Sequence, residues 1–227
     1  MARTARVPIP ARVAAMATDM TDVTQRSPGD AAAPDFEHRA QQCRDRLTGV
    51  PGGARSDDAW LFARLVAARE VRGELALLGL SAQALAGLAQ RHFVVDAGAQ
   101  LSSPDFPHQA PIVEATHAAF VASMRDFLIS RAAPDVDAAD AQCLATILAH
   151  ACLRPDHLWR DLGLAGRDDV THMLTRFFPE VVARNREGLR WKKLLARELA
   201  WATGGVPGPA PGCPGCEDFG FCFPQGR

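Results

Sequence analysis

Three cysteines near the end of the sequence have a spacing that suits metal binding. Cys213, Cys216 and Cys222 form a C-x2-C-x5-C motif within residues 204–227, a stretch rich in Gly and Pro. The two-residue gap lets a tight turn direct two thiolates at neighbouring positions of one site, and the longer gap brings the third from another side. Gly and Pro disfavour a regular helix or strand here. A flexible tail with incidental cysteines is the alternative, but the regular spacing favours a soft-metal site.

Small and aromatic residues alternate with these cysteines. Gly212, Gly215 and Gly220 would let the backbone approach a bound ion or cluster, with N–H groups pointing at sulfur. Three phenylalanines would screen such a site from water, namely Phe219, Phe221 and Phe223.

The composition indicates a helical, globular body. The chain has 227 residues, of which 48% are hydrophobic, and its net charge is −1. With no basic excess to neutralise phosphates, a nucleic-acid partner is not expected. Tyr is absent, whereas Ala, Leu and Arg dominate, which favours helices. Six cysteines are too few for a disulfide scaffold of this size.

The start of the sequence does not read as a targeting segment. Three arginines occur there, but Pro8 and Pro10 interrupt the apolar residues before a hydrophobic region develops. No run of about 18 uninterrupted apolar residues occurs, so no membrane span is expected. These features predict a cytoplasmic protein, and in a reducing compartment neighbouring thiols indicate metal or redox chemistry.

The pattern along the chain predicts an all-α protein with one multi-helix domain. We expect a disordered N-terminal segment over residues 1–34, a helical domain over 35–203 and an irregular metal-binding tail over 204–227. Ser56 and Ser81 are suited to cap helices, and Asp137 or Asp140 to open another. Helices are expected over 35–47, 57–71, 82–94, 112–131, 138–152, 155–163 and 167–177, and a last one from Pro179 to about residue 201.

Several polar residues outside the tail have two possible roles. His157 and Asp161 would share a helix face, and His157 either forms an ordinary hydrogen bond or faces the metal site. Cys43 lies on a helix without a partner and is expected to be inert. The last helix has a basic face, which is either solvated or attracts an oxyanion or an acidic protein; its residues are Arg184, Arg186, Arg190, Lys192, Lys193 and Arg197. No P-loop, G-x-G-x-x-G or G-x-S-x-G motif occurs, so no enzyme is predicted.

Several motifs taken together resemble the NifQ family. They are A-C-L-R-P-D-H-L-W-R-D-L-G-L (151–164), R-D-D-V (167–170), F-F-P (177–179), N-R-E-G-L-R-W-K-K (185–193) and the final cysteine motif, so that the resemblance covers roughly residues 110–224. It implies a cytoplasmic, helical carrier of an iron–sulfur cluster that contains molybdenum. Such a carrier receives molybdenum from molybdate or another source and donates it for the nitrogenase iron–molybdenum cofactor. The implied partners are the cofactor-assembly scaffold and the nitrogenase iron protein.

The chain departs from the family at one cysteine. The family pattern is C-x4-C-x2-C-x5-C, and its first cysteine falls on Gly208 here. Three thiolates still suffice for three irons, with molybdenum held by His157, a carboxylate or solvent. Cys152 or Cys143 as a fourth thiolate is a second possibility, and loss of function is a third.

The rival interpretation is a zinc-binding interaction or adaptor protein with a C-terminal cysteine knuckle. Zinc requires a closed tetrahedral ligand set. No histidine follows His172, so the tail cannot complete that set alone.

Overall fold

The structure is a computed structural model that describes residues 28–94, 96 and 113–224. Within these ranges every regular element is a helix and no strand occurs. The all-α prediction is therefore confirmed. The elements are α1 (Pro28–Thr48), α2 (Asp57–Glu70), η1 (Leu75–Leu78), α3 (Ala82–His92), α5 (Ala115–Ile129), α6 (Ala138–Ala151), α7 (Leu158–Asp161), α8 (Arg167–Phe177), α9 (Pro179–Ala183), α10 (Trp191–Ala202), η2 (Cys213–Gly215) and α11 (Phe219–Cys222).

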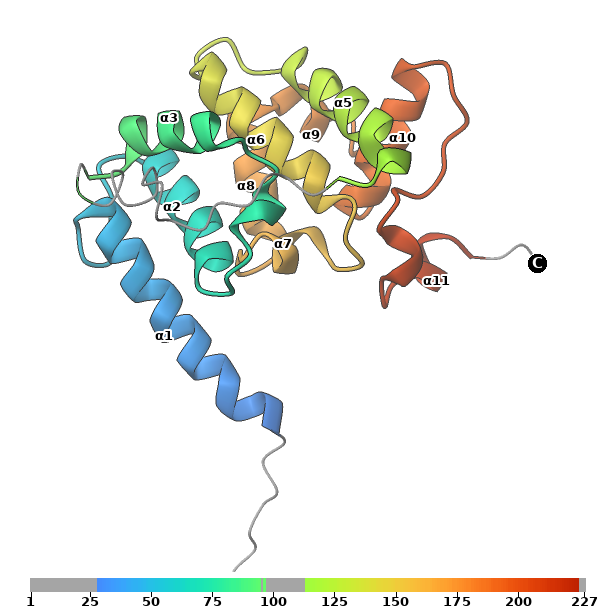
Figure 1. Cartoon of the computed structure of the whole chain (residues 1–227). Coiled ribbons are helices and arrows are strands. Elements are labelled where there is room, and N and C mark those ends of the chain that lie inside the picture. The colour runs from blue at the N-terminus through green and yellow to red at the C-terminus, as the bar shows by residue number, and fades with distance from the viewer. Residues whose placement is uncertain (1–27, 95, 97–112, 225–227) are drawn as a thin grey trace, which may run out of the picture.

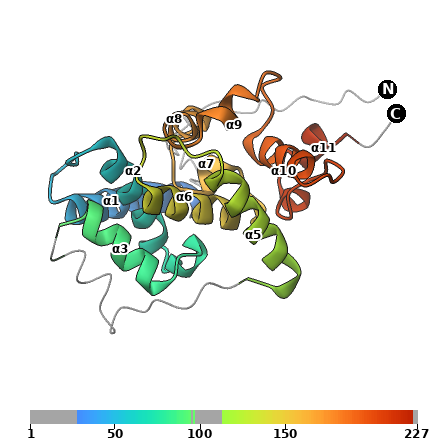
Figure 2. The same ribbon diagram turned by 90° about the horizontal axis from the view of Figure 1, so that it is seen from above.

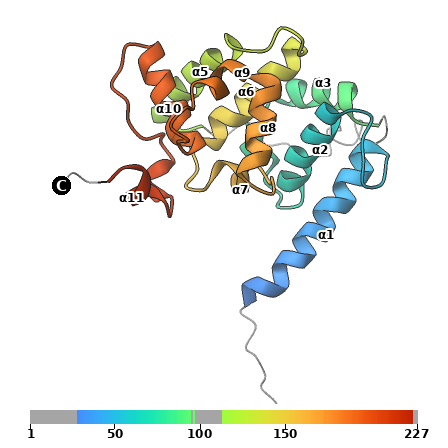
Figure 3. The ribbon, with the colours of Figure 1, turned by 180° about the vertical axis from the view of Figure 1, so that it is seen from behind.

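Helix α1 is longer than the sequence predicts. It begins at Pro28 instead of Asp35, so residues 28–34 of the segment predicted to be disordered are helical. Residues 1–27 of that segment lie outside the described residues. Proline is well tolerated in a first helical turn, and the three alanines from Ala31 to Ala33 favour helix. The N-terminal end of α1 projects away from the other helices (Figures 1 and 3).

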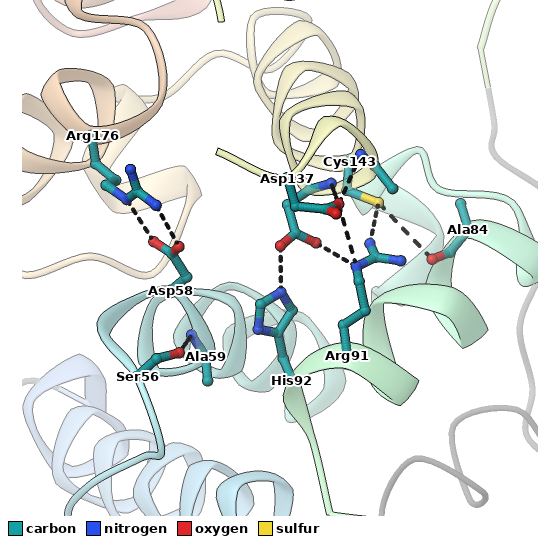
Figure 4. Close-up of polar contacts among 11 residues, drawn as sticks. Ser56, Asp58, Ala59, Ala84, Arg91, His92, Asp137, Cys143 and Arg176 are labelled. Atoms are coloured by element: carbon teal, nitrogen blue, oxygen red, sulfur yellow. Dashed lines mark hydrogen bonds and ion pairs between the residues drawn. The ribbon is translucent and has the colours of Figure 1, made fainter. Parts of the chain in front are cut away.

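Side-chain caps fix several helix starts where the sequence predicts them. Ser56 accepts a hydrogen bond from the Ala59 N–H at 3.1 Å (Figure 4), and Ser81 accepts one from the Ala84 N–H at 3.1 Å. Asp137 caps α6. These contacts satisfy N–H groups that have no partner within the helix.

Helix α6 forms the centre of the body. It packs against α5, α3 and η1, and it lies between α5 and the helices α1–α3 when the molecule is seen from above (Figure 2). Leu144, Ile147 and Leu148 on α6 are fully buried. Burying such side chains contributes about 1.5–3 kcal/mol each, so α6 anchors the hydrophobic core.

Three contacts between charged or polar side chains tie the helices together near this core. The buried Asp140 of α6 contacts Arg91 and His92 of α3, each at 2.7 Å, and Arg176 of α8 contacts Asp58 of α2 at 3.1 Å (Figure 4). None of these pairs involves the cysteine-rich tail, so the body has its own polar links.

The prediction of a single last helix from Pro179 is wrong. Helix α9 ends at Ala183, and α10 begins only at Trp191. Gly188 between them has a φ of 65°, a left-handed conformation that breaks a helix. The Asn185 side chain closes the loop, because it accepts from the Leu189 N–H at 2.7 Å and donates to the Leu189 carbonyl at 3.0 Å.

The tail, α10 and α11 lie at the end of the molecule opposite α1–α3 (Figures 1 and 3). None of the helices in the described ranges is long and apolar enough to cross a bilayer.

Candidate metal centre

Three segments that are distant in the sequence form one pocket. They are the turn between α6 and α7, the first residues of α10, and the tail. Residues that line the pocket include Cys213, Cys216, Cys222, His157, Arg190 and Asp218. The structure thus brings all three predicted cysteines and His157 to one place. The free volume enclosed is about 50 Å³.

Two glycines dock the tail on the α6–α7 turn. The Gly212 N–H donates to the Cys152 carbonyl at 2.9 Å, and a Cβ on Gly212 would lie 2.2 Å from the Arg154 carbonyl oxygen. A Cβ on Gly215 would lie 2.5 Å from Cβ of Pro155. These two glycines therefore allow contact between tail and body, and their predicted approach to a bound ion or cluster stays a prediction. Gly220 has no such neighbour within 4 Å.

Buried charges hold the turn on which the tail rests. The guanidinium of Arg154 contacts both carboxylate oxygens of Asp161 at 2.5 Å, and Arg69 contacts the same carboxylate at 2.7 Å. Lys192 of α10 donates to the Arg154 carbonyl at 2.8 Å. Burial disfavours the ionised carboxyl, but the hydrogen bonds from Arg154 and the surrounding positive charges hold the pKa of Asp161 below its ordinary value.

This network overturns the expectation that His157 and Asp161 share a helix face. Helix α7 begins at Leu158 instead of Pro155, and His157 precedes it with an extended backbone, φ −60° and ψ 141°. The buried Asp161 carboxylate contacts Arg154, whereas His157 lines the pocket.

The tail itself contains two short helical turns, which the sequence analysis does not predict. The Cys216 N–H donates to the Cys213 carbonyl at 2.9 Å within η2, and the Cys222 N–H donates to the Asp218 carbonyl at 2.9 Å within α11. Lys193 donates from Nζ to the Cys222 carbonyl, which ties α11 to α10. These bonds fix the spacing between the cysteines.

The pocket thiols are close enough for their charges to interact. Cys213 is buried, while Cys216 and Cys222 are half-buried. Burial raises the pKa of the Cys213 and Cys222 thiols, and a negative charge on Cys216 raises both further. The positive charges of Lys192, Lys193 and Arg190 oppose this. Thiolates crowded in this way suit a positively charged metal core, which stabilises all of them together.

The other three cysteines do not line this pocket. Cys152 is fully buried behind Cys213, and burial raises its pKa to about 12. Cys143 lines a separate groove beside Arg91. Cys43 is buried near Glu70, with a pKa raised by burial to about 12, as expected of an unreactive thiol. The structure therefore does not bring either proposed fourth thiolate to the pocket.

Two carboxylates of the tail contact the His157 side chain. Its Nε2 lies 3.0 Å from Oε1 of Glu217 and 3.6 Å from Oδ2 of Asp218. Arg160 also contacts Glu217 at 3.1 Å, and Arg190 contacts Asp218 at 2.7 Å. Neither Glu217 nor Asp218 was predicted as a site residue, although both lie between Cys216 and Cys222 in the sequence.

Aromatic side chains cover part of the pocket. Phe219 and Phe223 line it with ring centroids 5.4 Å apart, while Phe221 is 78% exposed and does not. The predicted screening thus involves two of the three phenylalanines. Trp191 also lines the pocket, and its buried Nε1–H has no hydrogen-bond acceptor among the described residues.

Gly208, where the family has its first cysteine, lies in a different groove. That groove runs between α5 and α10 and is lined by Phe120, Leu199 and Val206. No side chain or backbone atom lies within 4 Å of a Cβ added at Gly208.

The pocket thiols surround a space and do not converge on one point. In the described part of the chain, no three cysteine, histidine or carboxylate side chains are placed to hold a single metal ion. In a cluster each thiolate binds a different iron, so convergence on one point is not needed. Three thiol donors around one pocket therefore fit the ligand chemistry of an iron–sulfur cluster.

Comparison with known proteins points to one family. The NifQ family model matches residues 59–224. "Protein NifQ homolog" of Sinorhizobium fredii is 42% identical over 83 residues, 37% of this chain and 36% of that protein. "Protein NifQ" of Azotobacter vinelandii is 41% identical over 80 residues, 35% of this chain and 41% of that protein. "Protein NifQ" of Klebsiella pneumoniae is 36% identical over 85 residues, 37% of this chain and 51% of that protein.

The aligned segments thus span between about a third and a half of these relatives' lengths. No solved structure matches the chain. Because the family model covers well over half of the sequence, including the cysteine motif, the chain belongs to the NifQ family.

Proposed function

We propose that the protein acts in nitrogen fixation as a molybdenum and iron–sulfur carrier that donates molybdenum for biosynthesis of the nitrogenase iron–molybdenum cofactor. The observation that carries this proposal is the meeting of Cys213, Cys216 and Cys222 around one pocket in a chain of the NifQ family. The protein would work as a carrier in the cytoplasm, not as an enzyme. Its partners would be the cofactor-assembly scaffold and the nitrogenase iron protein, and molybdate would be its source of molybdenum.

In this proposal the three cysteines hold iron. A cluster of three irons and one molybdenum offers one thiolate site per iron and leaves the molybdenum for other ligands. His157 lines the same pocket and supplies a nitrogen donor that a harder metal accepts. Phe219 and Phe223 reduce access of water to the thiolates.

Weak protein ligation of molybdenum suits a donor, since the metal must be held and later released. Cys152 is fully buried and Cys143 lines another groove, so neither thiol lines the pocket where it could serve as a fourth thiolate ligand. This placement supports compensation for the missing fourth cysteine by ligands other than thiolate.

The test is metal and sulfide analysis of the full-length protein purified without oxygen, together with electron paramagnetic resonance. We expect a brown protein with iron, sulfide and molybdenum and a cluster signal. A colourless protein loaded with zinc would instead establish the zinc-binding adaptor.

A further inference from the structure

At the edge of the cysteine pocket, two arginines and one histidine of the body contact carboxylates of the tail. His157 precedes α7, Arg160 lies on α7, and Arg190 directly precedes α10. The carboxylates that contact them, from Glu217 and Asp218, both lie between the second and third cysteines. His157, Arg190 and Asp218 line the pocket, while Arg160 and Glu217 contact each other beside it. The proposed cysteine site does not explain this group of contacts.

The contacts converge on two carboxylate groups. Oε1 of Glu217 lies 3.0 Å from Nε2 of His157 and 3.1 Å from Nη2 of Arg160. Oδ2 of Asp218 lies 2.7 Å from Nη2 of Arg190 and 3.6 Å from Nε2 of His157. The three donor side chains thus surround the carboxylate oxygens of Glu217 and Asp218. A bound oxyanion would present similar negatively charged oxygens to them.

These three donor side chains belong to the body and stay in place if the tail carboxylates leave. Arg160 has a second partner on its own segment, Asp156 at 3.0 Å, and lies over the Trp159 ring. Arg190 and His157 have no other acidic partner among the described residues. Removing the tail carboxylates would therefore leave two uncompensated donors beside the thiols.

The ion pairs at this edge of the pocket are easily replaced. The side chains of Glu217 and Arg190 are 61% and 45% exposed, and ion pairs at such positions contribute little to stability. A tetrahedral dianion brings more charge and more acceptor oxygens than one carboxylate, and guanidinium groups match its geometry. Trp191, whose buried Nε1–H has no acceptor among the described residues, lines the same pocket.

We propose that His157, Arg160 and Arg190 form a binding site for tetrahedral dianionic oxyanions, which Glu217 and Asp218 fill in the free protein and vacate when the oxyanion binds. Carboxylate oxygens already lie within hydrogen-bond distance of these donors, so an oxyanion takes this position only if the two carboxylates move. The site rests on the proposed function in one respect, since it would present molybdate to the three cysteines.

The test is calorimetric titration of the full-length protein, purified without oxygen, with molybdate at fixed ionic strength, and with sulfate and phosphate in parallel. Glu217→Gln combined with Asp218→Asn should bind molybdate about tenfold more tightly, because the internal competitor has lost its charge. Arg190→Gln should bind it about tenfold more weakly. Arg125→Gln is the matched control, since Arg125 is also 45% exposed and pairs with an aspartate away from this pocket.

The proposal is overturned if the carboxylate variant binds molybdate no more tightly than the native protein, or if Arg190→Gln binds it equally well. Equal binding of sulfate and molybdate would support a general oxyanion site, and preference for molybdate would support a site for the cargo. Iron content measured on the same samples separates the two proposals. A native protein without iron whose carboxylate variant still binds molybdate more tightly would refute the carrier but not this site.

Discussion

Individual cysteines differ here mainly in what surrounds them. Cys213, Cys216 and Cys222 share a pocket with cationic and aromatic side chains, whereas Cys43, Cys143 and Cys152 are packed between helices. The spacing of the first group could be interpreted from the sequence because a short loop keeps near neighbours together. The position of Cys152 could not be predicted from the sequence, because it depends on how the end of α6 is oriented towards α10 and the tail.

Gly208 tests whether the missing family cysteine matters. Because Gly208 lies in the groove between α5 and α10, a thiol there would not join the pocket without movement of the tail. We expect Gly208→Cys to leave the iron and molybdenum content nearly unchanged and to bring no gain in donor activity in a host that lacks its own donor. A nearly metal-free native protein, rescued severalfold by Gly208→Cys, would contradict this expectation.

His150 predicts a pH dependence of stability. It is 4% exposed, and burial, aided by the charge of Arg154, lowers its pKa from 6.5 to about 4. Between these pH values the unfolded chain takes up a proton at His150 that the folded chain does not. The free energy of unfolding is therefore not reduced by His150 above pH 6.5, and it falls as the pH drops towards 4. The loss would reach about 3 kcal/mol.

Urea unfolding of the native protein and of His150→Gln at several pH values measures this effect. The variant should lose part of the slope of unfolding free energy against pH in this window, whatever its stability at neutral pH. Equal slopes in the two proteins would show that His150 is not the cause.

At the scale of elements, the sequence predicts helix starts better than helix ends and loops. Ser56 and Ser81 act on N–H groups three residues away, so their caps are visible locally. The break before α10 depends on a left-handed Gly188 and on both side-chain bonds of Asn185 to Leu189, a combination that apolar periodicity does not reveal.

The docking of the tail on the α6–α7 turn depends on Gly212. A methyl group there would meet the Arg154 backbone at 2.2 Å, so Gly212→Ala must push the tail outward. We expect a cost of about 1–3 kcal/mol for docking and a clear loss of bound iron after anaerobic reconstitution. Gly220→Ala is the matched control, because Gly220 has open space and should retain its iron. Equal iron contents in the two variants would argue against this docking contact.

At the scale of the molecule, the helical body and the tail have separate supports. The core centres on α6, and the tail adds to the buried apolar residues only Ala210 and Cys213 among its described residues. The contacts that join tail and body, such as His157 with Glu217, connect residues 60 positions apart. Such long-range charge pairs could not be predicted from sequence, because they depend on the final arrangement of α7, α10 and the tail.

This separation predicts that the body folds without metal. Deletion of residues 204–227 should leave the helical circular dichroism nearly unchanged, unlike a zinc finger, whose folding depends on its metal. A collapse of the helical signal on deletion would contradict this, and the same measurement on the full-length protein after chelation provides the control.

The most direct test of the account is the iron content and electron paramagnetic resonance spectrum of alanine variants at each pocket cysteine, prepared without oxygen. Cys213→Ala, Cys216→Ala and Cys222→Ala should each lose most of the iron and the cluster signal while keeping native helicity. Cys143→Ala, which removes a buried thiol outside the pocket, should keep both. Full iron content in Cys216→Ala would contradict the central claim that these three thiolates hold the cluster.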